Sequence, residues 1–192
     1  MKTLVKIMYE DQQAADASNY GPHQLVSRCV LERLGWPEER LYELQRHVIG
    51  QPKKGDTKLL AACQNPNEAR NCQHVFAVFD DDQVRAIKPL ALSPNACKLQ
   101  VRAAIQSTSP YRDQLRVVLL GRNMESVVAA VQGCKQLAVT GKLRPLDRDR
   151  VLASLAWAVD ATPIRDCVLR AVPSLEYLVA RISTIIAANL GA

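Results

Sequence analysis

The chain has 192 residues, and 48% of them are hydrophobic, which is enough apolar material for a folded core. It carries 25 lysines and arginines against 19 aspartates and glutamates, and the resulting net charge of +6 favours a polyanionic partner. The sequence shows neither a signal-peptide pattern nor an uninterrupted apolar segment of transmembrane length. We therefore expect a cytoplasmic protein that does not enter a membrane.

Six cysteines are scattered along the chain with no close pair, and most of them lie in apolar helical contexts. A thiol in such a place packs as a small hydrophobic group. We expect all six cysteines to be reduced and structural.

Strands and helices are predicted to alternate over most of the chain. Apolar runs rich in β-branched residues predict strands, and apolar residues at helical spacing predict helices. In chain order, the prediction is a strand at 4–10, helices at 22–34 and 37–47, a basic loop at 50–56, a helix at 57–63, a strand at 74–80, a helix at 94–106, a strand at 114–120 and a helix at 125–136. This alternation implies an α/β fold with a small, mainly parallel sheet that is flanked by helices.

The pattern changes at Pro145, after which no strand is predicted. Apolar periodicity and three prolines at plausible boundaries predict helices at 146–159, 163–171 and 173–190. We expect an α/β body over residues 1–144 and a helical C-terminal extension over residues 145–192, packed on that body.

Acidic residues follow the predicted strands. Glu10 ends the first strand, Asp80 and Asp82 follow the second, and Glu125 comes shortly after the third. The carboxyl ends of parallel strands face one crevice, where ligands bind in such folds. Side chains alternate along an extended chain, so Asp80 and Asp82 should share one side while Asp81 points away.

Carboxylates gathered from separate strands suit Mg²⁺ or Mn²⁺, which take one or two carboxylates together with water and phosphate oxygens. Such an ion can activate water and neutralise charge on a phosphoryl group, and the sequence leaves open whether one ion or two are bound. A simpler reading treats Asp80 to Asp82 as a solvated turn, Glu125 as an acid favoured by its helix dipole, and Lys53 and Lys54 as a solvated patch.

The acids also resemble a known module. A glutamate at the end of the first strand, followed by an apolar strand ending in Asp-x-Asp, is similar to the TOPRIM domain of topoisomerases, primases and overcoming-lysogenization-defect nucleases. The stretches "VVLLGRNMESVVAA", "VPSLEYLVARI" and "KKGDTKLL" resemble small TOPRIM-like proteins that are often encoded beside an ABC-type ATPase. Together these stretches cover most of the chain, and they imply a TOPRIM-like, Rossmannoid fold.

The resemblance assigns a role to each charged residue. Glu10 would be the metal-linked acid or general base, Asp80 and Asp82 the metal ligands, and Glu125 a further acid of the site. The residues implied for contact with phosphate or nucleic acid are Lys53, Lys54 and Arg122.

The function implied by this resemblance is a divalent-metal-dependent nuclease that hydrolyses DNA or RNA in antiviral or genome defence, with an ATPase partner. One alternative is a non-catalytic adaptor of such an ATPase, because Asp11 stands where the family usually has glycine after the first glutamate. A further alternative is a haloacid-dehalogenase-like phosphatase, in which Asp80 would be the nucleophile and Asp82 the acid/base. The sequence leaves the oligomeric state open, including a homo-oligomer.

Overall fold

The structure, a computed structural model, describes residues 3–10, 21–87, 90–121, 124–135 and 145–191, and for residues 145 and 146 it describes the backbone alone. The chain forms two compact units, and each is assembled from two separate segments. Unit 1 consists of Met1–Gln13 and His47–Asn123, and unit 2 consists of Ala14–Arg46 and Met124–Ala192.

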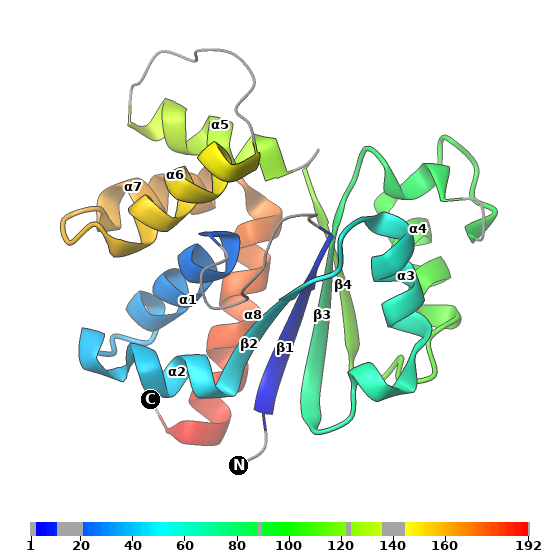
Figure 1. Ribbon diagram of the computed structural model, residues 1–192, viewed down its shortest axis with the longest axis horizontal. Coiled ribbons are helices and arrows are strands. Elements are labelled where there is room, and N and C mark those ends of the chain that lie inside the picture. Colours follow the sequence, from blue (N-terminus) through cyan, green and yellow to red (C-terminus); the bar gives the residue numbers. More distant parts are fainter. Residues whose placement is uncertain (1–2, 11–20, 88–89, 122–123, 136–144, 192) are drawn as a thin grey trace. The chain divides into compact units, whose positions relative to one another are not determined.

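Unit 1 contains a sheet of four parallel strands, which confirms the predicted α/β class with a parallel sheet (Figure 1). The strands are β1 (Thr3–Tyr9), β2 (Val48–Pro52), β3 (Cys72–Asp80) and β4 (Leu115–Leu120), and their order across the sheet is β2-β1-β3-β4. The central strands β1 and β3 are mostly apolar and buried, as is typical of strands inside a parallel sheet.

Strand β2 is the element that sequence reasoning missed, because residues 50–56 were expected to form a loop after a helix. Gly50 and Pro52 both disfavour strands, yet they pair in register with Ile7 and Tyr9 of β1. Proline is tolerated here because β2 lies at the edge of the sheet and Pro52 is its last residue.

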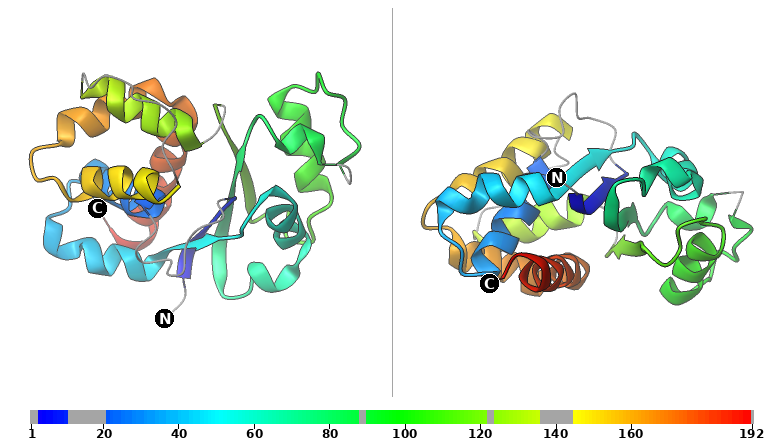
Figure 2. Two further views of the ribbon diagram at one scale, coloured as in Figure 1. Left: turned by 45° about the horizontal axis from the view of Figure 1, so that its top comes forward. Right: turned by 90° about the horizontal axis from the view of Figure 1, so that it is seen from below.

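Two helices cover one face of the sheet in unit 1. They are α3 (Asp56–Gln64) and α4 (Lys98–Ser107), and Figure 2 shows them on the same side of the strands in both views. Their apolar side chains form one core with alternate residues of the strands, including Met8, Leu59, Phe79, Val101 and Val117. Short 3₁₀ turns, η3 (Pro66–Glu68) and η4 (Val84–Ala86), precede and follow β3.

Unit 2 is helical. Its elements are α1 (Gly21–Arg33), η2 (Glu38–Arg40), α2 (Leu41–His47), α5 (Met124–Cys134), α6 (Pro145–Trp157), α7 (Thr162–Ala171) and α8 (Pro173–Leu190). Helix α1 packs on α6 and α8, and α5 packs on α6 and α7. The helical C-terminal region is therefore confirmed. The expected boundary at residue 144 would place α1 and α5 in the α/β body. The two compact units divide the chain differently, since α1 and α5 belong to unit 2.

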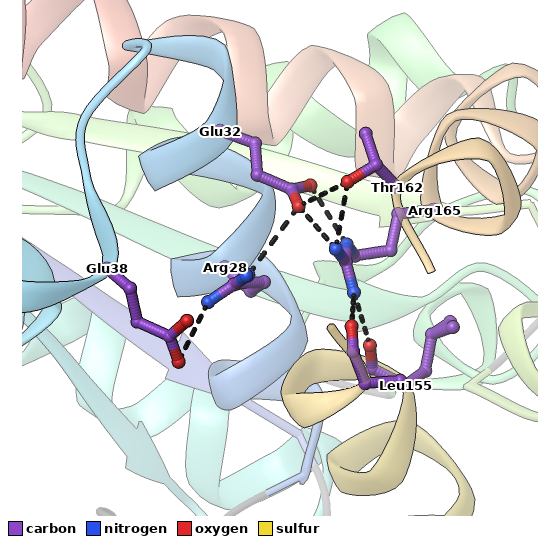
Figure 3. A network of polar contacts seen from close by, with 7 residues as sticks. Arg28, Glu32, Glu38, Leu155, Thr162 and Arg165 are labelled. Carbon is purple, nitrogen blue, oxygen red and sulfur yellow. Dashed lines mark hydrogen bonds and ion pairs between the residues drawn. The ribbon is translucent and has the colours of Figure 1, made fainter. Parts of the chain in front are cut away.

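A buried ion network joins three helices of unit 2 (Figure 3). Arg165 of α7 has no exposed side-chain surface, and its Nε donates to Glu32 Oε2 at 2.9 Å. Its Nη1 donates to the carbonyls of Leu155 and Ala158, at 2.8 and 3.0 Å, at the end of α6. Arg28 adds a second cation 3.5 Å from Glu32. Because every charge here has an opposite partner, the network can be buried and joins α1, α6 and α7.

One expectation about the cysteines is wrong. Cys134 of α5 and Cys167 of α7 form a disulfide, with 5.9 Å between their Cα atoms. They are 33 residues apart in sequence, and only the packing of α5 on α7 brings them together. The other four cysteines are free thiols.

Within the described residues, no single helix is long and apolar enough to cross a membrane. Helices α7 and α8 meet the length and composition criteria only as a pair, and that pair is bent by 115°.

Candidate functional site

The strand order creates a switch point at the carboxyl edge of the sheet in unit 1. The chain passes from β1 to β2 on one side and then crosses to β3 on the other side of β1, so the direction in which strands are added reverses between β1 and β3. Ligands of parallel sheets bind outside the carboxyl ends of the strands at such a point. Glu10 directly follows β1 and Asp80 is the last residue of β3, so the structure brings two of the predicted residues together there.

Glu10 is held in place by hydrogen bonds on both of its sides. Its backbone N–H donates to Val78 O at 3.2 Å, and its side-chain Oε2 accepts the backbone N–H of Asp80 at 2.8 Å. On the other side, Gly55 N–H donates to the backbone carbonyl of Glu10 at 2.5 Å. The Glu10 carboxylate is therefore fixed at the end of β3, beside the switch point where parallel sheets bind ligands.

The loop after β2 reaches Glu10 through an unusual backbone conformation. Lys54 has a φ of 60° and Gly55 a φ of 114°, a region that favours glycine. This turn directs Gly55 N–H to Glu10 and starts α3 at Asp56, whose Oδ1 accepts Thr57 N–H at 2.6 Å. Asp56 was not predicted as a residue of this site, because its electrostatic effect on Glu10 depends on this turn.

The surroundings of Glu10 raise the pKa of its carboxyl group from 4.5 to about 7, and burial is the largest cause. The hydrogen bond from Asp80 N–H acts in the opposite direction, while the negative charges of Asp56 and Asp82 make smaller contributions that also raise the pKa. A carboxyl group with a pKa near neutrality can both accept and release a proton at physiological pH.

The three consecutive aspartates have different surroundings. Asp80 is partly buried and Asp82 is exposed, whereas Asp81 is buried. Asp81 Oδ1 lies 2.7 Å from Arg85 Nη1, and its Oδ2 lies 3.5 Å from Lys98 Nζ. Asp81 is thus a member of a local ion cluster, whereas Asp82 acts electrostatically on Glu10.

The predicted phosphate contacts do not all have the same role. Lys53 Nζ lies 2.6 Å from Glu68 Oε1, and Lys6 Nζ lies 3.2 Å from Glu68 Oε2. Burial raises the pKa of Glu68, but the hydrogen bonds and charges of Lys53 and Lys6 outweigh burial and lower that pKa. Lys53 is therefore engaged in a mostly buried ion cluster, whereas Lys54 is exposed. Arg122 lies outside the described residues, as does Asp11.

Glu125 is the second residue of α5 and belongs to unit 2. Its Oε1 lies 3.4 Å from Arg148 Nη1. These contacts belong to unit 2, and the role of Glu125 in the acidic site stays a prediction.

The carboxyl edge of the sheet carries the acidic residues Glu10, Asp80 and Asp82, whose carboxylate oxygens are potential ligands for a hard cation. Among the described residues, no group of three or more His, Cys, Asp or Glu side chains is arranged to hold a metal ion. Mg²⁺ needs few carboxylates, since it keeps several waters and takes phosphate oxygens from its substrate. Glu10, Asp80 and Asp82 do not form such a group of three, so a metal ion at this edge stays a prediction.

Comparisons of the chain with protein-family models, with curated proteins and with solved structures found no match.

Proposed function

We propose that the protein is a divalent-metal-dependent nuclease whose site lies at the switch point of unit 1. The observation that carries the proposal is the Glu10 carboxylate, which Asp80 N–H fixes at the carboxyl edge of the sheet. Its burial, together with the charges of two nearby acids, raises its pKa to about 7. An edge that gathers negative charge in this way favours a bound cation. The basic net charge of the chain suits a polyanionic substrate.

In this proposal each residue of the site has a separate role in phosphodiester hydrolysis. Asp80 and Asp82 would hold Mg²⁺ or Mn²⁺, which when bound supplies charge neutralisation at the phosphoryl group. Glu10 accepts the proton of the attacking water at its carboxylate, for which its raised pKa is suited. Lys54, exposed beside the N-terminus of α3, contacts a phosphate of the nucleic acid strand.

The resemblance to TOPRIM-like proteins supports the wider part of the proposal, which is a role in antiviral or genome defence with an ABC-type ATPase partner. The adaptor alternative is favoured by one observation, the lack of a group of three metal-ligating side chains among the described residues. The phosphatase alternative gains no support, since two strands precede the one that ends at Asp80.

Titration calorimetry with Mn²⁺, with and without a single-stranded oligonucleotide, tests the proposal. We expect binding by the wild-type chain and its loss in the double variant Asp80→Ala, Asp82→Ala. Asp113→Ala is the matched control, because Asp113 is an exposed aspartate of the same unit. Cleavage of labelled DNA and RNA in Mn²⁺ should follow the same pattern. A wild-type chain that binds no metal in either condition would favour the adaptor.

A further inference from the structure

Arg85 contacts the middle residue of the aspartate triplet in two ways. It lies in η4, and its Nη1 donates to the backbone carbonyl of Asp81 at 2.5 Å. The same nitrogen lies 2.7 Å from the Asp81 carboxylate. Arg85 therefore fixes both the main chain and the side chain of the residue that links Asp80 to Asp82.

The same guanidinium also binds a segment eleven residues further along the chain. Arg85 Nε donates to the carbonyl of Ala96 at 2.8 Å, just before α4 begins at Lys98. Lys98 Nζ in turn lies 3.5 Å from Asp81 Oδ2. The segment that leaves β3 and the segment that enters α4 are thus tied together at Asp81.

The ion pair between Arg85 and Asp81 is mostly buried. The side chains of Arg85 and Asp81 are 22% and 12% exposed, and Val84 next to Arg85 is fully buried. Arg85 makes a charge-assisted hydrogen bond to the backbone carbonyl of Asp81 and an ion pair with its carboxylate, which together restrict the backbone more than a single neutral hydrogen bond does. The contact also compensates the charge of Asp81, the middle one of three adjacent carboxylates.

We infer that Arg85 is a positioning residue, which fixes through Asp81 the peptide that carries Asp80 and Asp82. The inference rests on the proposed function, since it gives those two aspartates their role in binding the ion. Side chains that hold metal ligands in place from behind change metal affinity by about 10- to 100-fold when they are removed. We expect an effect of that size for Arg85, without direct contact between Arg85 and the ion.

The test compares Arg85→Met with Arg85→Lys and with Arg112→Met, an exposed arginine of the same unit. Arg85→Met removes the guanidinium but keeps an apolar stem of similar length. Arg85→Lys keeps the charge beside Asp81 with a single nitrogen in place of three, and it carries the test if Arg85→Met does not fold. Three quantities are measured for each chain: the Mn²⁺ dissociation constant by calorimetry, the thermal midpoint, and amide hydrogen exchange at residues 80–83.

For Arg85→Met we expect an Mn²⁺ dissociation constant about 10- to 100-fold higher and faster exchange at residues 80–83. The dissociation constant and exchange rate of Arg85→Lys should fall between those of Arg85→Met and the wild type. Arg112→Met should match the wild type. A lower thermal midpoint with unchanged metal affinity means that Arg85 only stabilises the fold, and it overturns the inference alone. A wild-type chain that binds no Mn²⁺ overturns the proposed function and the inference with it.

Discussion

Glu10 of unit 1 and Glu32 of unit 2 are both partly buried carboxylates, but their surroundings differ in kind. The Glu32 carboxylate forms ion pairs with Arg165 and Arg28 and accepts a hydrogen bond from the hydroxyl of Thr162, so two cations oppose its charge. Glu10 accepts a backbone N–H, and among the described residues the charged groups that shift its pKa are two further acids.

The contrast separates a structural carboxylate from a candidate functional one. Removing a carboxylate from water carries a free-energy cost, which cations offset at Glu32. At Glu10 the cost appears as a raised pKa, and such unrelieved shifts are typical of functional sites.

The largest effect is expected from breaking the structural network. Arg165→Met leaves Glu32 with one cation and removes the Nη1 donor from the carbonyls of Leu155 and Ala158, the second of which keeps the N–H of Ala161. We expect a loss of about 3–5 kcal/mol in the free energy of unfolding, measured by urea denaturation. Arg150→Met is the control, because its ion pair with Asp147 is on the surface and should contribute less than about 0.5 kcal/mol. Equal losses in the two variants would show that burial of the network contributes nothing.

A slightly smaller effect should come from the covalent link in the same unit. Closing a loop of 33 residues stabilises a fold by about 3–4 kcal/mol through restriction of the unfolded chain. The double variant Cys134→Ser, Cys167→Ser should therefore melt at a lower temperature than the wild type, and it should be insensitive to reductant. Cys97→Ser, at an exposed free thiol, should change little. Alkylation of both Cys134 and Cys167 in the purified, unreduced chain would contradict the prediction.

The smallest effect concerns Glu10 and depends on pH. Its pKa is higher in the folded state, so between 4.5 and about 7 the folded chain keeps a proton that the unfolded chain has lost. The contribution of Glu10 to stability therefore falls as the pH rises through this window. Because Glu10 is partly exposed, we expect a total change of only about 1 kcal/mol.

Glu10→Gln removes this titration, so its stability relative to the wild type should increase from pH 4 to pH 8. The measurement is the difference in thermal midpoint across that range, and Glu39→Gln, at an exposed glutamate, is the control. Parallel curves for the wild type and Glu10→Gln would argue against a raised pKa.

Much of the fold follows from local patterns in the sequence. The long apolar runs of β1, β3 and β4 and the helical periodicity after Pro145 are strong signals, and the structure confirms them. The proximity of Glu10 and Asp80 was also predictable, because carboxyl ends of neighbouring parallel strands meet at one edge. Strand β2 was not predictable, because Gly50 and Pro52 are tolerated only at the edge position that tertiary structure gives them.

The remaining features depend on contacts between distant residues, which no local pattern records. Lys53 forms an ion pair with Glu68 of η3, and no sequence pattern predicts this contact. The link from Arg85 to Ala96 and the Cys134–Cys167 disulfide likewise follow from packing.

The position of β1 also has a consequence for synthesis on the ribosome. β1 is made before the other three strands, yet it lies inside the sheet, and its neighbours β2 and β3 begin only at Val48 and Cys72. Until β3 has emerged, the nascent chain exposes an apolar strand with unpaired backbone groups, which is a template for aggregation. Unit 2 is completed after unit 1, since its helix α1 packs on α6 and α8, which follow all four strands in the sequence. The sheet of unit 1 thus cannot be completed before β4 (Leu115–Leu120) is made, and a chain released before that point exposes the surfaces that chaperones bind.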